Sequence, residues 1–88
     1  MQVLADTSGL YALLDASDGY HRPACRAWKE LVESDQDIVV HHFVFHEVCS
    51  LLQARLGFEA VELFLRDFLP LMTLCPVAQE VLWRGITR

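Results

Sequence analysis

Three short apolar runs alternate along the chain with longer stretches in which apolar residues recur every three or four positions. The short runs predict buried strands at residues 2–5, 38–40 and 71–75. The second of these runs consists of β-branched residues, which favour strands. The longer stretches predict helices at residues 8–14, 20–34, 43–56 and 58–68, with a further helix from residue 76. The pattern therefore predicts the element order βααβααβα.

Glycine and proline support these boundaries. Gly57 stands where a residue with positive φ would end the third helix, and Pro70 stops the fourth. Pro76 opens the last helix at a position that tolerates a missing N–H. Because helices separate the strands, the strands need crossover connections, which favour parallel pairing. We expect an α/β fold with a parallel sheet of about three strands flanked by helices, in a single domain at residues 1–88.

Composition adds expectations about partners and location. Hydrophobic residues form 53% of the chain and charged residues 22%, which leaves little polar surface for a small globule. A homodimer or a bound partner is therefore expected. No apolar run reaches the roughly 18 residues that a membrane span needs, and the three cysteines lie far apart. We expect a cytoplasmic protein with reduced thiols and no membrane partner.

The charge balance restricts how this chain would contact nucleic acid. A formal net charge of −5 provides no overall basic field, so any RNA contact must be local or bridged by a metal. Arg22, Arg26 and Lys29 recur on one face of the second predicted helix. They could contact RNA phosphates, but a solvated charged face is the simpler interpretation.

Asp6 is the first candidate for chemistry. It follows the first predicted strand directly and precedes a helix, which places its carboxylate at the carboxyl edge of the sheet. Ligands of open α/β sheets gather at this edge, and a carboxylate there can bind a metal. The simpler alternative is that Asp6 is the N-cap of the helix that follows.

Glu47 is the second candidate. On a helical projection it falls between Ala54 and Leu51, within a broad apolar face that also contains Val44 and Val48. We therefore expect the Glu47 carboxylate to be buried, and a buried carboxylate must be paired, hydrogen-bonded, protonated or bound to metal.

The chain offers one structural partner for Glu47 in the same helix, since Arg55 lies two turns away. An ion pair with Arg55 is the alternative to a metal site. Two oxygen ligands from separate elements suit Mg²⁺ or Mn²⁺, which complete their coordination with water and substrate phosphates. Asp6 and Glu47 are therefore predicted metal ligands.

Several segments resemble a known family. Residues 3–15, Val-Leu-Ala-Asp-Thr-Ser-Gly-Leu-Tyr-Ala-Leu-Leu-Asp, resemble the opening of a PIN domain, particularly in the VapC-like toxin ribonucleases of type II toxin-antitoxin systems. Residues 18–24 are similar to the acid-x-x-His-x-x-Ala start of that family's second helix, and residues 44–48 continue the likeness. The resemblance covers the whole chain.

The resemblance implies a PIN-like fold in which a ring of acidic residues holds Mg²⁺ or Mn²⁺ and cleaves RNA. Asp6 matches the first acid and Glu47 the second, so both would be catalytic metal ligands. Family members continue with a helix that carries a third acid, a further strand and a Thr-x-Asp segment, whereas this sequence ends at Thr87 and Arg88. The resemblance therefore implies an incomplete domain, truncated at its C-terminus.

Three further positions bear on the site. Ser8 matches a family position that can hydrogen-bond a metal-bound water or a phosphate, which makes it a candidate substrate-binding residue; capping of the first helix is the alternative. His41 and His42 stand where the family has Thr or Ser and are poorer N-caps, so the geometry near Glu47 is expected to differ. His46 projects to the polar side of its helix, which disfavours a zinc site with His42.

Two functions from different classes remain open. One is a Mg²⁺- or Mn²⁺-dependent endoribonuclease of toxin type, which hydrolyses RNA phosphodiester bonds and is weak or inactive as this 88-residue chain. The other is a non-catalytic interaction module that dimerises or binds an antitoxin. RNA and a cognate antitoxin are the partners that the resemblance implies.

Overall fold

The computed structural model describes residues 2–75, and these form a three-stranded sheet with helices between the strands. The observed order matches the predicted alternation of strands and helix pairs through the third strand. The predicted helix from residue 76 lies outside the described residues. The elements are β1 (Gln2–Leu4), α1 (Thr7–Leu14), α2 (His21–Glu33), β2 (Asp37–His41), α3 (His42–Leu56), α4 (Phe58–Leu63), the π-helical segment η1 (Phe64–Phe68), the 3₁₀ turn η2 (Leu69–Leu71) and β3 (Met72–Cys75).

The sheet is parallel, as the sequence predicts, and β2 is its central strand. Val3 pairs with Ile38 in β1 and β2, and Ile38 in turn pairs with Met72 of β3. The backbone N–H of Ala5 still donates to the Val39 carbonyl at 2.8 Å, so pairing continues to the residue before α1 begins. The carboxyl ends of all three strands therefore meet at one edge.

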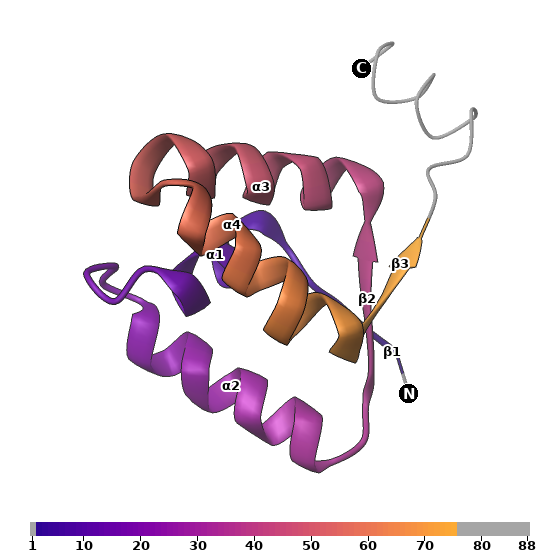
Figure 1. Cartoon of the computed structure of the whole chain (residues 1–88). Helices are drawn as coiled ribbons and strands as arrows, with labels where there is room; N and C mark the ends of the chain where they lie inside the picture. The colour runs from indigo at the N-terminus through magenta and orange to yellow at the C-terminus, as the bar shows by residue number, and fades with distance from the viewer. Residues whose placement is uncertain (1, 76–88) are drawn as a thin grey trace, which may run out of the picture.

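The two faces of this sheet differ. Figure 1 shows the helices on one side of the three strands. Ile38 and Val40 of β2 are buried against them. On the other face Asp37 accepts hydrogen bonds from the side chains of Gln2 and Thr73, at 3.4 and 3.0 Å. Residues 2–75 thus cover one face of the sheet and leave the other open to solvent.

The core lies between the covered face of the sheet and the helices. Its completely buried side chains come from the middle strand β2 and from two helical elements, α3 and η1, namely Val40, Val48, Leu52 and Phe64. Phe64 stacks on Phe45 of α3 with ring centroids 6.1 Å apart, and Phe68 packs on Trp28 of α2 at 5.3 Å. The wider turn of η1 therefore carries two aromatic rings that contact different helices.

The two ends of α3 differ in how well they are capped. Gly57 follows the helix with φ 97° and donates its N–H to the Leu52 carbonyl, which confirms its predicted role at the C-terminus. His41 occupies the N-cap position without a side-chain hydrogen bond to the helix, as expected for histidine there.

No helix within residues 2–75 combines the length and the apolar character that crossing a membrane requires.

Candidate functional site

Asp6 occupies the junction between β1 and α1. Its Oδ1 accepts a hydrogen bond from the backbone N–H of Gly9 at 2.7 Å, so the side chain caps the first turn of α1. The capping alternative is therefore confirmed. The cap engages only one oxygen of the carboxylate. Oδ2 has no hydrogen-bond partner among residues 2–75, and the side chain is exposed, so Oδ2 can still bind a ligand.

Gly9 leaves the space that this cap needs. A Cβ atom at residue 9 would lie 2.9 Å from Asp6 Oδ1, closer than side-chain carbons approach oxygen in proteins. A larger residue at position 9 would displace the Asp6 carboxylate. The small residue three positions after Asp6 therefore helps to fix where the carboxylate points.

The structure corrects the predicted environment of Glu47. The sequence predicts a buried carboxylate in an apolar helix face, but Glu47 is exposed. The side of α3 that faces the core is centred on Val48 and Leu52, and Glu47 lies at its margin. Because α3 carries apolar residues around most of its circumference, the pattern alone could not identify the sector that packs on the core.

Glu47 also lacks the structural partner considered for it. The Arg55 guanidinium lies over the ring of Tyr11, 5.2 Å from its centroid. Among residues 2–75, no ion pair joins Arg55 to Glu47. The Arg55 alternative is therefore wrong for this structure.

The partner of Glu47 is a residue that the sequence did not single out. The hydroxyl of Thr7 donates a hydrogen bond to Glu47 Oε1, with the two oxygens 2.5 Å apart. Thr7 follows Asp6 directly and is the first residue of α1. One hydrogen bond thus brings Glu47 beside the residue that follows Asp6, at the carboxyl edge of the sheet. The sequence contained one weak signal for Thr7, namely that it carries a hydroxyl and is adjacent to the candidate ligand Asp6.

The carboxylate oxygens of Asp6 and Glu47 are the type of ligand that a hard cation prefers, and they would fill part of its coordination sphere. Both side chains offer carboxylate oxygens, and each has one oxygen engaged and one without a partner in the described part of the chain. Mg²⁺ and Mn²⁺ accept one or two protein carboxylates and retain water or phosphate ligands. Between residues 2 and 75, no group of three or more His, Cys, Asp or Glu side chains gathers to hold a metal.

Ser8 lies beside this pair without capping α1. Asp6 makes the cap, so the capping alternative for Ser8 is wrong. Ser8 is exposed and lines a surface hollow of 330 Å³ together with Asp6 and residues of the α2 start, including Tyr20 and Pro23. Its predicted role toward substrate stays a prediction.

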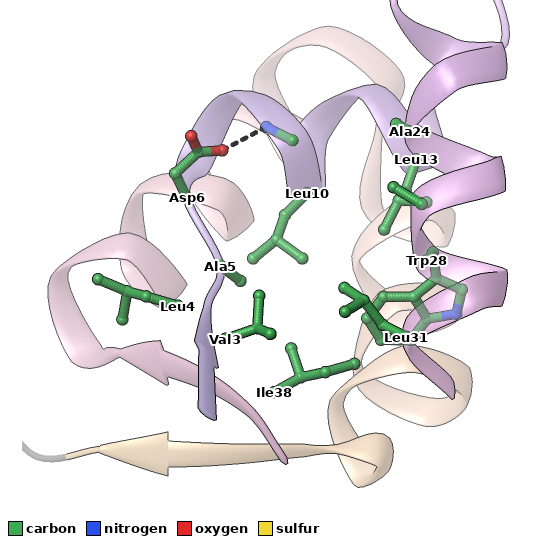
Figure 2. Close-up of a pocket in the computed structure, with 12 residues that line it drawn as sticks. Val3, Leu4, Ala5, Asp6, Leu10, Leu13, Ala24, Trp28, Leu31 and Ile38 are labelled. Carbon is green, nitrogen blue, oxygen red and sulfur yellow. Dashed lines mark hydrogen bonds between the residues drawn. The ribbon is translucent and has the colours of Figure 1, made fainter. Parts of the chain in front are cut away.

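A second hollow, of 190 Å³, lies between β1, α1 and α2 (Figure 2). Leu10, Leu13 and Leu31 converge on it in Figure 2, and Trp28 closes one side. Asp6 is the single charged residue in its lining and lies at its edge. Such an apolar lining suits hydrophobic side chains better than RNA phosphates. Apolar side chains of α2 line this hollow, and no residue of α2 is fully buried.

The segment that resembles the start of the family's second helix has a structural role here. A ring nitrogen of His21, Nδ1, lies 2.7 Å from the Ala12 carbonyl oxygen, which ties the start of α2 to α1. Asp18 accepts the backbone N–H of Tyr20 at 2.8 Å and shapes the turn between the helices. These contacts fix α2 against α1.

The remaining polar candidates are surface groups. Arg22 and Arg26 are exposed, and Lys29 is paired with Glu33 at 3.9 Å across one helical turn. This arrangement agrees with the solvated charged face. His46 is exposed as predicted, with its ring edge-on to His42 at 6.1 Å.

Comparison with solved structures identifies the fold. The chain superposes on the crystal structure of Mycobacterium tuberculosis VapC20, a PIN-domain toxin that cleaves the sarcin-ricin loop, with a TM-score of 0.75. The fold is PIN-like. The two sequences are 23% identical, and the match covers 100% of this chain and 68% of VapC20.

Two other comparisons give no match. No family model matches the sequence, and no curated protein matches it significantly. The structural likeness therefore carries the assignment of the fold, and it confirms the PIN-like architecture that residues 3–15 and 18–24 predict.

Proposed function

We propose that this chain carries the first two ligands of a divalent-metal site in a toxin-type endoribonuclease, with Asp6 and Glu47 as the metal-binding and catalytic acids. The observation that carries the proposal is the Thr7–Glu47 hydrogen bond, which spans 40 residues of sequence and joins Glu47 to the residue that follows Asp6. The PIN-like fold supports it, because VapC20, which shares this fold, is an RNA-cleaving toxin.

The residues present determine what this site can do. Asp6 and Glu47 would hold Mg²⁺ or Mn²⁺ through the oxygens that are not already engaged. The bound cation would stabilise negative charge on the phosphodiester and lower the pKa of a coordinated water. Asp6, fixed by the first turn of α1, keeps its free oxygen at the sheet edge. Ser8, which is exposed and lines the same hollow as Asp6, would donate a hydrogen bond to a phosphate oxygen.

The partners follow from the same proposal. The substrate is RNA, held locally through the metal because the chain has a net charge of −5. With two carboxylates as its ligands among residues 2–75, the site is expected to support weak cleavage. A cognate antitoxin and a second copy of the chain complete the expected set of partners.

Cleavage and metal binding test the proposal together. The probe is a labelled RNA hairpin that carries the sarcin-ricin loop, incubated with the protein and Mn²⁺, while Mn²⁺ affinity is measured by electron paramagnetic resonance. Asp6→Asn and Glu47→Gln should each lower cleavage on the order of 100-fold and weaken Mn²⁺ binding. Glu33→Gln removes the same charge from an exposed position and serves as the control. Equal Mn²⁺ affinity and cleavage in wild type and Asp6→Asn would remove Asp6 from the site.

A non-catalytic interaction module is the second candidate, and the apolar hollow beside Asp6 favours it. Its apolar lining would take hydrophobic side chains of an antitoxin, and Asp6 at its edge would pair with an arginine of the same partner. Size-exclusion chromatography with light scattering tests the homodimer. A chain that stays monomeric and cleaves the hairpin would contradict a purely binding role.

A further inference from the structure

We infer that Thr7 is a positioning residue of the proposed metal site, and that its hydroxyl holds the Glu47 carboxylate toward Asp6. The inference rests on the proposed function, because it needs Asp6 and Glu47 to share a cation. It concerns a residue with no carboxylate of its own.

The contact joins two elements that have no other polar link at this edge within residues 2–75. Thr7 lies in the first turn of α1 and is half-buried, whereas Glu47 extends from the second turn of α3 and is exposed. The Thr7 hydroxyl donates its hydrogen bond to Glu47 Oε1, and Glu47 Oε2 has no partner in the described structure.

Glu47 needs such a contact to act as a ligand. An exposed glutamate has several freely rotating bonds, so an unrestrained carboxylate would sample many positions. Arg55 is engaged over Tyr11 and does not restrain it. The Thr7 hydroxyl therefore selects the rotamers in which Glu47 faces the sheet edge. Hydrogen bonds of this kind commonly orient metal-binding carboxylates.

The first turn of α1 orients both carboxylates in the same way. The Gly9 N–H fixes one oxygen of Asp6, and the Thr7 hydroxyl fixes one oxygen of Glu47. In each pair the second oxygen has no partner among residues 2–75. The positive end of the α1 dipole also favours negative charge at this turn. A single helix turn thus prepares two ligands that come from different parts of the sequence.

A pair of substitutions separates the hydroxyl from the size of the side chain. Thr7→Val keeps the shape and removes the hydroxyl, and Thr7→Ser keeps the hydroxyl. Thr7→Val should weaken Mn²⁺ binding about tenfold, measured by electron paramagnetic resonance, whereas Thr7→Ser should stay within about twofold of wild type. Circular dichroism verifies folding, and Thr7→Ala provides a second variant without the hydroxyl if Thr7→Val is poorly folded.

The Glu47→Gln background shows whether Thr7 acts through Glu47. There, adding Thr7→Val should weaken Mn²⁺ binding no further, because the carboxylate that it positions is gone. A full tenfold loss in that background would overturn the inference. So would equal affinities of Thr7→Val and wild type, or equal losses in Thr7→Val and Thr7→Ser.

Asp6→Asn distinguishes this inference from the proposed function. If Asp6→Asn weakens Mn²⁺ binding and Thr7→Val does not, the metal site stands and the positioning role of Thr7 is wrong. If Asp6→Asn binds Mn²⁺ as tightly as wild type, the site itself fails and the inference falls with it.

Discussion

Asp15 is the C-cap residue of α1, and its carboxylate accepts three hydrogen bonds. Its Oδ2 accepts the Tyr11 hydroxyl at 2.6 Å, and its Oδ1 accepts both the backbone N–H and the hydroxyl of Ser17, at 2.9 and 2.6 Å. The Ser17 hydroxyl, followed by the Tyr11 hydroxyl, lowers the pKa of Asp15 below its usual value. The pKa of Tyr11 is raised, chiefly because its hydroxyl donates to Asp15.

This network predicts a stability change in acid. Because the pKa of Asp15 is lower in the folded protein than in the unfolded chain, its contribution is present above about pH 4 and is lost as the pH falls through the folded pKa. Asp15→Asn should therefore be less stable at neutral pH and should lose less stability than wild type between about pH 4 and pH 2. Urea denaturation at several pH values measures this. Glu30→Gln, an exposed acid of α2, controls for charge; parallel stability curves for wild type and Asp15→Asn would contradict the prediction.

Single residues also show where sequence reasoning succeeds and fails. The position of Asp6 was predictable, because a residue between a strand and the helix that directly follows lies at the carboxyl edge of the sheet, independently of how the core packs. Glu47 was predicted to be buried, and that was wrong, because its side chain is exposed; its role as a metal ligand stays a prediction. Thr7 was not identified, because its contact spans 40 residues and depends on how α1 and α3 pack.

At the scale of elements, the junction between α3 and α4 depends on the conformation of one residue. Gly57 has φ 97° and ψ 177°, a region that side chains with a Cβ rarely adopt. A Cβ at residue 57 would meet no atom within 4 Å, so the backbone alone determines the cost of a substitution.

Gly57→Ala should lower the free energy of unfolding by about 1 to 3 kcal/mol. Gly19 provides a matched control, because a Cβ there also meets nothing within 4 Å and its φ is not positive. Gly19→Ala should leave stability unchanged or raise it by up to about 1 kcal/mol. Thermal and urea denaturation of both variants give the comparison, and equal effects at the two positions would show that the Gly57 conformation carries no strain for alanine.

The sequence predicted element types better than their internal geometry. Short apolar runs and helical spacing located the three strands and the helical stretches α1, α2, α3 and α4–η1 of residues 2–75 to within a residue or two, but did not predict the 3₁₀ turn η2. The change from α4 to the π turn of η1 was not predictable, because the hydrogen-bond spacing of a helix leaves no separate mark in an apolar pattern. The rings of Phe64 and Phe68, which contact different helices, show that tertiary packing accompanies this turn.

At the scale of the whole molecule, residues 2–75 cover one face of the parallel sheet and leave the other open. The order of elements was enough to predict parallel strands, because each pair is separated by helices long enough for a crossover. It was not enough to predict how completely the two faces are covered. Parallel sheets are usually covered on both faces, yet on the open face Leu4 is 63% exposed.

Two adjacent valines of β2 test this asymmetry, because they differ mainly in the face on which they lie. Val40 is completely buried against the helices, whereas Val39 is half-buried on the other face. Val40→Thr places a hydroxyl in the core and should cost about 1 to 3 kcal/mol of unfolding free energy. Val39→Thr should change it by no more than about 0.5 kcal/mol, since threonine suits a solvated strand position as well as valine.

The comparison also bears on the proposed homodimer when urea denaturation is repeated at several protein concentrations. If the open face stays solvated, the Val39→Thr effect is small at every concentration and the Val40→Thr effect is constant. If a second copy covers that face, Val39→Thr becomes destabilising, and more so as concentration rises, because it weakens association that is linked to folding. A large loss for Val39→Thr that does not depend on concentration would contradict an open face within the single chain.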